Sequence, residues 1–120
     1  RVELTNENDA QIFISIHANA LSDNVLDKEI SGTEVYYFYP QSKELAQKVL
    51  QSITNKTDSI NRGVHQQSFA VVRNTNALSI LIEVGYMIDP DEDIKLSNEK
   101  YRKLVAQAIK EGVEEFLNDI

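Results

Sequence analysis

Two polar side chains stand at the ends of apolar runs, and their chemical types could support hydrolysis. His17 follows the apolar residues 12–16 within SIHANA (15–20), and Glu83 lies near the end of SILIEV (79–84). A neutral imidazole is a metal ligand, and a carboxylate held near apolar walls has a raised pKa and can move protons. If both runs are neighbouring strands of an open α/β sheet, the two groups converge on one crevice.

Each candidate also has a structural interpretation. A single His at a strand end is more often a hydrogen-bonded structural residue than a ligand. Glu is rarely buried unless it is paired or functional, so a salt bridge from Glu83 to Arg62 or Arg73 is the alternative to a catalytic role. His65 is flanked by polar loop residues, and we expect it to be solvated. Zinc hydrolysis needs three protein ligands, and the composition does not visibly supply them.

Composition excludes several classes of protein. The 120 residues suit one domain, and the net charge of −7 argues against binding nucleic acid or an anionic membrane. Without cysteine there is no disulfide, thiolate zinc site or cysteine nucleophile. No apolar run approaches the roughly 20 residues that span a bilayer. The chain opens at Arg1 without Met, and we expect it to be part of a longer protein.

The hydrophobic pattern predicts strands interleaved with helices, which is typical of an α/β fold with a mixed, mostly parallel sheet. Two runs, 11–16 and 79–84, are apolar on both faces and predict central strands covered on both sides. Two further strands are expected, at 32–39 and 69–72. Helices are expected from Ser42 through Ile53, from Asp91 and over 98–118, and a helix is expected to end within 1–8. Loops are expected at 21–31, 54–61 and 62–67.

Five ordered motifs resemble the zinc-dependent N-acetylmuramoyl-L-alanine amidases of the amidase 3 family. Arg1 and Asn6 also match an Arg and an Asn in the family's preceding helix, so the resemblance covers the whole chain. The matches are DAQIFISIHANA (9–20) to aDlfiSIHaNa, GTEVYYF (32–38) to GxEtyyy, NRGV (61–64) to NRGv, FAVVR (69–73) to fxVLr, and ILIEVGYMID (80–89) to vLvElGFisN.

This resemblance implies a fold and an activity. The family's sheet has six strands, about four of which would be present here, which makes residues 1–120 the C-terminal portion of one amidase catalytic domain. The implied reaction cleaves the amide between the lactyl group of N-acetylmuramic acid and the L-alanine of the stem peptide. The partners would be the peptidoglycan glycan and stem peptide, outside the cytoplasm, as for a cell-wall autolysin. Any wall-binding module would lie outside this chain.

The resemblance also implies roles for the two candidates. His17 matches the family's last zinc ligand, and Glu83 matches its catalytic glutamate, which takes a proton from zinc-activated water. The other two ligands, a His in a GHGG loop and a Glu in the next helix, would precede Arg1. We therefore expect these 120 residues alone to be inactive.

Other motif residues have plainer interpretations. Gly63 and Gly85 are expected to permit turns or close backbone approach. Arg62 and Arg73 either anchor loops or bind a stem-peptide carboxylate, and anchoring is the commoner role. The aromatic run 36–38 is expected to lie in the core.

Three positions depart from the family pattern, and two other functions stay open. Leu78 replaces the usual Pro, Tyr86 the usual Phe and Asp89 the usual Asn. The alternatives are a catalytically inactive domain that binds wall polymer or a partner protein, and an inactive structural fragment. Retention of both His17 and Glu83 favours the enzyme, because a binding domain needs neither.

Overall fold

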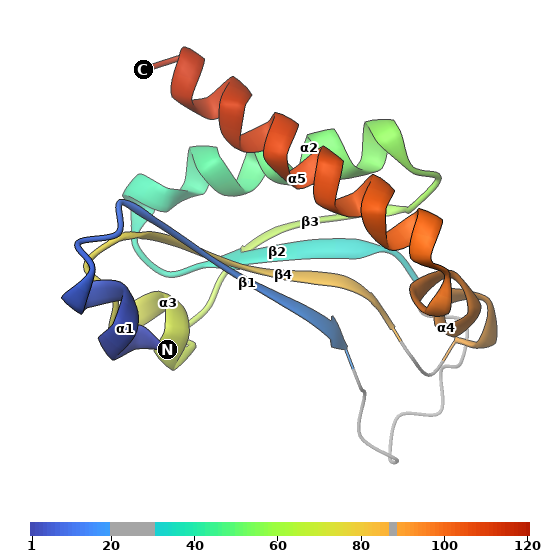
Figure 1. The fold of residues 1–120 in the computed structure, drawn as a ribbon, viewed down its shortest axis with the longest axis horizontal. Helices are drawn as coiled ribbons and strands as arrows, with labels where there is room; N and C mark the ends of the chain where they lie inside the picture. Colours follow the sequence, from blue (N-terminus) through green and yellow to red (C-terminus); the bar gives the residue numbers. More distant parts are fainter. Residues whose placement is uncertain (20–30, 87–88) are drawn as a thin grey trace.

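A mixed four-stranded sheet organises the computed structural model, which describes residues 1–19, 31–86 and 89–120 (Figure 1). The described strands lie in the order β1-β4-β2-β3. β1 pairs with β4, and β2 with β3, in parallel, whereas β2 and β4 are antiparallel. The predicted mixed, mostly parallel sheet is thereby confirmed. The strand bounds are β1 Ile12–Asn19, β2 Thr33–Tyr37, β3 Asn61–Gln66 and β4 Leu78–Tyr86.

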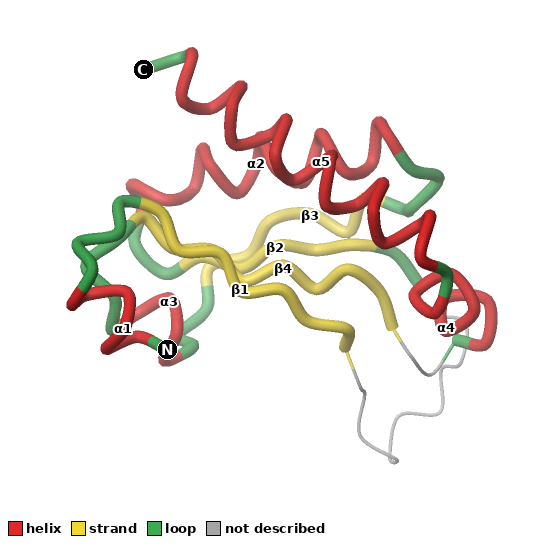
Figure 2. Tube along the Cα trace, viewed as in Figure 1, coloured by secondary structure: helices red, strands yellow, loops and turns green. Residues whose placement is uncertain are grey.

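Two helices cover one face of this sheet. α2 and α5 lie over the same face, and α1 and α3 lie together on the other side (Figures 1 and 2). Among the described residues, no helix is long and apolar enough to cross a membrane. The helix bounds are α1 Val2–Glu7, α2 Lys43–Lys56, α3 Ala70–Arg73, α4 Pro90–Ser97 and α5 Glu99–Asn118, with a short 3₁₀ turn at Pro40–Ser42.

The hydrophobic core lies between the sheet and the pair α2 and α5. Alternate strand residues point to opposite faces, so Ile80 and Ile82 of β4 enter this core with Val35 of β2, and none of the three is exposed. Leu45 and Ile53 of α2, on the helix side of the core, belong to the same cluster of buried side chains. Each such buried side chain contributes about 1.5–3 kcal/mol of transfer free energy. Because Ile82 points into the core, Glu83 points to the opposite face.

The two covering helices begin in different ways. The predicted C-terminal helix is confirmed as α5, and the Asn98 side chain caps it by accepting from the Tyr101 N–H. The helix expected from Ser42 is also confirmed as α2, but it runs on to Lys56, into the expected connector. Ser42 does not cap α2. Its hydroxyl instead accepts from the Ser79 N–H at 3.0 Å, which ties the helix start to β4.

Two segments differ from the prediction. Residues 62–67 were expected to be a loop but form most of β3, because their polar sequence suits a strand at the edge of the described sheet that is largely open to solvent. Gly63, at φ +88°, lies where the β2–β3 register shifts. Residues 69–72 were expected to be a strand, yet residues 70–72 belong to the helix α3, and Phe69 is its N-cap residue. Burial of Val72 overrides the β preference of this valine-rich stretch.

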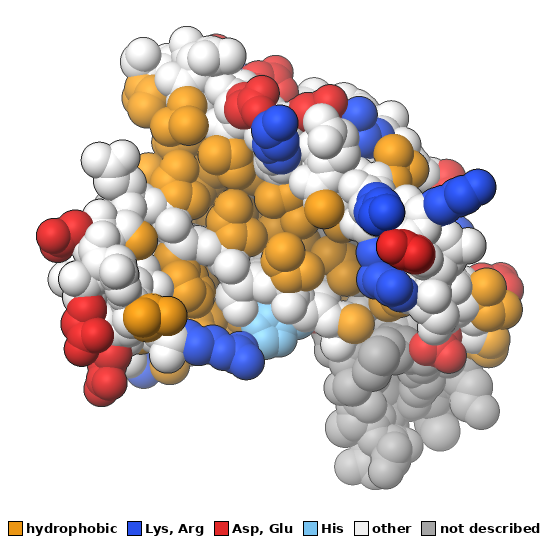
Figure 3. All heavy atoms as spheres, viewed as in Figure 1, with side chains coloured by type: hydrophobic (Ala, Val, Ile, Leu, Met, Phe, Trp, Pro, Cys, Tyr) orange, Lys and Arg blue, Asp and Glu red, His pale blue; other side chains and the backbone are white. Residues whose placement is uncertain are grey.

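β1 also departs from its expected surroundings. Its apolar sequence predicted a strand covered on both sides, but it lies at an edge of the described sheet and leaves Ile16 56% exposed. Beside Ile16 and Ala18, a cavity of about 290 Å³ opens toward Val105 and Ile109 of α5. Figure 3 shows apolar side chains gathered across this face of the molecule. The loop expected at 21–31 lies almost wholly outside the described residues.

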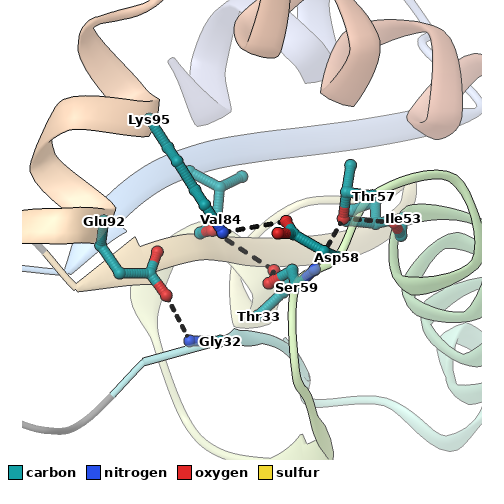
Figure 4. Close-up of polar contacts among 9 residues, drawn as sticks. All are labelled: Gly32, Thr33, Ile53, Thr57, Asp58, Ser59, Val84, Glu92 and Lys95. Atoms are coloured by element: carbon teal, nitrogen blue, oxygen red, sulfur yellow. Dashed lines mark hydrogen bonds and ion pairs between the residues drawn. The ribbon is translucent and has the colours of Figure 1, made fainter.

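A polar cluster fixes the end of the sheet where β2 begins and β4 ends (Figure 4). Glu92 of α4 accepts from the Gly32 N–H at 2.6 Å, and Lys95 pairs with Asp58 at 2.9 Å. The Thr33 hydroxyl donates to the Val84 carbonyl at 3.3 Å. α4 is thereby held against the strand ends that carry the candidate site.

Candidate active site

His17 and Glu83 are direct register partners on the parallel strands β1 and β4. Ile14 of β1 packs against the core, as Ile82 of β4 does. Strand alternation therefore directs both polar side chains to the face away from α2 and α5. The expected convergence of an imidazole and a carboxylate near the carboxyl ends of two neighbouring strands is found.

The His17 ring is held by its own strand. Its Nε2 atom lies 2.6 Å from the Ser15 hydroxyl, two residues earlier and on the same face of β1. Ser15 is only 7% exposed, so this hydrogen bond fixes an imidazole that is itself half-buried. A fixed ring suits a ligand, because little side-chain freedom remains to be lost on binding.

Glu83 has the unusual environment of the site. Among the described residues its Oε2 atom is buried and has no hydrogen-bond partner. Burial, and then the charge of Glu34, raise its pKa to about 7. A buried carboxylate oxygen without a partner lowers stability, so its presence calls for a functional explanation.

The predicted structural partners of Glu83 are engaged elsewhere. The Arg62 guanidinium lies over the Tyr86 ring, 5.4 Å from its centroid. Arg73 donates to the Ser68 hydroxyl at 2.7 Å and to the Asn74 side chain. Within the described part of the chain, neither arginine forms a salt bridge with Glu83, so the salt-bridge interpretation is not supported. Both arginines contact neighbouring protein groups, as the loop-anchoring role predicts.

A third charged residue, Glu34, was missed by sequence reasoning. It lies directly opposite Glu83 in the antiparallel pairing of β2 with β4, and it is 6% exposed. Its carboxylate accepts a hydrogen bond from the Tyr86 hydroxyl. The available signal was a carboxylate placed between Thr33 and Val35, two residues that proved fully buried.

The two tyrosines beside Glu34 remain protonated at neutral pH. Burial and the hydrogen bond to Glu34 raise the pKa of Tyr86 to about 12 and raise that of Tyr36 as well. Their hydroxyl groups are therefore available as donors to a buried carboxylate, which needs such donors to offset its desolvation.

His65 belongs to the Glu34 side of the site rather than to His17. Its Nε2 atom lies 3.5 Å from Glu34 Oε2 and 2.9 Å from the Arg62 carbonyl. The side chain is 47% exposed, so the expected solvation is partly confirmed, although the residue lies on β3 and not in a loop. Its ring is 5.6 Å from that of Tyr36.

The remaining motif residues support the site from outside. Asn6 of α1 accepts from the Asn76 N–H at 2.9 Å, which fixes the turn before β4. Asp89, at a family Asn position, caps α4 through the Asp91 N–H. Gly85 lies where an added Cβ would collide with the Glu92 carboxylate, so the predicted close approach is confirmed there. Leu78 simply opens β4 as the partner of Ile12.

These groups fit part of a zinc centre and do not complete one. In residues 1–19, 31–86 and 89–120, no three His, Asp or Glu side chains are grouped so as to hold a metal ion. His17 supplies one imidazole, and the neighbouring Glu83 offers an unpartnered carboxylate oxygen. A catalytic zinc site takes three protein ligands and an open position. With His17 as one ligand, two further ligands would be needed.

Comparison with known proteins gives a consistent result. The family model described as N-acetylmuramoyl-L-alanine amidase (Amidase_3) matches residues 1–115. The chain is 32% identical over 107 residues to the probable cell wall amidase LytH of Staphylococcus saprophyticus, and 33% over 106 residues to that of Staphylococcus epidermidis. These alignments cover 89% and 88% of the chain.

Solved structures agree in fold. An N-acetylmuramoyl-L-alanine amidase from Clostridium difficile 630 superposes with a TM-score of 0.90 at 35% identity. The catalytic domain of CwlV, from Bacillus (Paenibacillus) polymyxa var. colistinus, gives 0.88 at 32%. Each comparison covers 98% of this chain but 63% of the other. The chain spans only 35% of the length of the two staphylococcal relatives.

Proposed function

The chain belongs to the N-acetylmuramoyl-L-alanine amidase family Amidase_3, and on that basis we propose that its protein is a peptidoglycan hydrolase. The bond cleaved is the amide between the lactyl group of N-acetylmuramic acid and the L-alanine of the stem peptide. The observation that carries this proposal is the pairing of His17 with Glu83, whose half-buried carboxylate has an oxygen with no hydrogen-bond partner in residues 1–19, 31–86 and 89–120.

His17 is assigned to a zinc ion as one of three ligands, with the other two on residues upstream of Arg1. When bound, zinc would polarise the lactyl carbonyl and lower the pKa of a coordinated water. The hydrogen bond between Ser15 and His17 supports this role because it orients the His17 ring before any metal arrives.

Glu83 is assigned to proton transfer. A pKa near 7 in the metal-free site matches the requirement for a group that accepts a proton and then releases it at neutral pH. The proton taken up by Glu83 passes to the nitrogen of the departing L-alanine, which leaves as a neutral amine. The Oε2 atom supports this assignment, since no donor among the described residues competes with the proton.

The proposed substrate also places the protein outside the cytoplasm, in the cell wall or periplasm. Its partners there are the glycan strand and the stem peptide. The staphylococcal relatives are named cell wall amidases, which agrees with this location. With a net charge of −7, this chain has little attraction for an anionic wall polymer, so retention at the wall is assigned to a separate module.

Digestion of purified peptidoglycan by the full-length protein tests the function. New alanine amino termini should appear, and Glu83→Gln should lower their rate of formation about 10²-fold or more while zinc content stays unchanged. His17→Ala should lose zinc. His65→Ala, the matched histidine control, should keep it. Full activity in Glu83→Gln would refute the assigned base, and a wild-type protein that binds peptidoglycan without cleaving it would identify an inactive wall-binding domain.

A further inference from the structure

We propose that Glu34 is a positioning residue for Glu83, held in place by Tyr86 and directing the Glu83 carboxylate toward β1. This inference rests on the proposed function, since it concerns the residue assigned there as the base. It adds a second carboxylate to the site, one that would contact neither the metal nor the substrate.

The Glu34 carboxylate is anchored on β2, which flanks β4 on the side opposite to β1 and His17. The Tyr86 hydroxyl donates to Oε1, and the His65 Nε2 lies 3.5 Å from Oε2. The Tyr36 ring lies beside His65, with the two ring centroids 5.6 Å apart. With partners from β3 and β4 around a side chain that is 6% exposed, the charge has little room to move.

An anchored charge at this place acts on its neighbour. Glu34 and Glu83 are opposite one another on β2 and β4, while His17 is opposite Glu83 on the other flank, on β1. Two like charges on adjacent strands repel each other, and only Glu83 is free to respond. The repulsion therefore favours the Glu83 conformations that point toward β1.

Packing alone does not explain a carboxylate at position 34. Burying a charge costs several kcal/mol before its partners offset the cost, and neutral residues of similar volume often serve a core equally well. The ring of Tyr86 would fill the same space without its hydroxyl group. Packing therefore does not require the hydrogen bond between Tyr86 and Glu34. A role for the negative charge itself accounts for both groups.

The test compares two equally buried carboxylates in the full-length, zinc-loaded protein. Glu34→Gln keeps the volume and an acceptor for Tyr86 but removes the charge. Glu92→Gln is the matched control, because Glu92 is also 6% exposed but binds the Gly32 N–H, away from Glu83. Activity is measured on a soluble muramoyl peptide to obtain kcat and KM separately, together with zinc content and melting temperature.

Glu34→Gln should lower kcat about tenfold or more, with KM within about twofold and zinc content unchanged, because a misplaced catalytic group costs up to about 10²-fold in rate. Glu92→Gln should keep kcat within about twofold. Tyr86→Phe keeps the charge but loosens it, so kcat should fall to a value between wild type and Glu34→Gln.

Several results would overturn the inference. They are an unchanged kcat in Glu34→Gln, a loss of zinc in that variant, or falls in kcat and melting temperature that Glu92→Gln reproduces. If Glu34→Gln does not fold, an unchanged kcat in Tyr86→Phe would also overturn the inference. Failure of the proposed function is distinguishable, because the wild-type protein would then release no alanine amino termini, whereas failure of the assigned base would leave Glu83→Gln active whatever Glu34→Gln does.

Discussion

Glu34 and Glu83 are direct partners across β2 and β4, yet their environments differ. The Glu34 carboxylate accepts a hydrogen bond from the Tyr86 hydroxyl and lies near His65. One oxygen of Glu83, in contrast, has no hydrogen-bond partner in the described part of the chain. Neighbouring carboxylates with different environments take different protonation states, which is how active sites separate an acid from a base. Of the two, Glu83 is the group to which the proposed mechanism assigns proton transfer.

The first prediction concerns the pH dependence of catalysis. Glu83 must be ionised to accept a proton, and its pKa of about 7 belongs to the metal-free site. A nearby zinc ion favours the ionised form and moves this pKa down. We expect kcat/KM to fall about tenfold per pH unit below a midpoint at or below about 7. Rates measured from pH 5 to 9 check this, and a rate that rises toward pH 5 would contradict it.

A second prediction concerns stability in the metal-free protein. The folded-state pKa of Glu83 lies above its value of 4.5 in the unfolded chain, so folding favours the protonated form. That contribution is fully present below about pH 4.5 and is lost as pH rises through about 7. Glu83→Gln removes the buried charge, and its melting temperature should exceed that of wild type at pH 8.

The same comparison at lower pH supplies the control. Near pH 5 the wild-type carboxyl is protonated in the folded state, so the advantage of Glu83→Gln over wild type should shrink. An advantage that is the same at pH 5 and pH 8 would mean that the amide stabilises through packing and not through removal of the charge.

The sequence predicted the elements that the core requires. The apolar runs around Ile14 and Ile82 became β1 and β4, and the apolar stripe with Val105 and Phe116 became α5, because these residues have no stable place outside a core. His17 and Glu83 could be placed from the same runs, since a polar residue ending an apolar strand is conspicuous.

What the sequence did not predict depends on tertiary contacts. The strand β3 has almost no apolar alternation, and its backbone is ordered by pairing with β2. The short helix α3 holds Val72 in the interior despite a sequence that favours a strand. Glu34 was unassigned because its chemistry comes from Tyr86 and His65, which lie 52 and 31 positions away.

A third prediction tests the N-terminal cap of α5. The Asn98 side chain accepts from the Tyr101 N–H at 3.1 Å, and α5 provides much of the cover for the core. Asn98→Ala leaves that donor without a protein partner and should cost about 1 kcal/mol of unfolding free energy in urea titrations. Asn118→Ala at the opposite end of the helix is the control and should change the unfolding free energy by less than about 0.5 kcal/mol. Equal losses in the two variants would mean that the loss does not come from the capping hydrogen bond of Asn98.

The fourth prediction tests how α4 is held against the end of β4, two residues beyond Glu83. At Gly85 an added methyl group would meet the Glu92 carboxylate, which accepts from the Gly32 N–H at 2.6 Å. Gly85→Ala must displace that carboxylate, and we expect a loss of about 1–3 kcal/mol of unfolding free energy.

A double-mutant cycle identifies the cause. In a Glu92→Ala background the collision partner is gone, so Gly85→Ala should cost less than half of what it costs in wild type, a coupling typical of residues in contact. The remaining cost comes from Leu96 Cδ1, which lies 3.3 Å from the added Cβ. If Gly85→Ala is equally costly in both backgrounds, Glu92 is not the group that requires glycine at position 85.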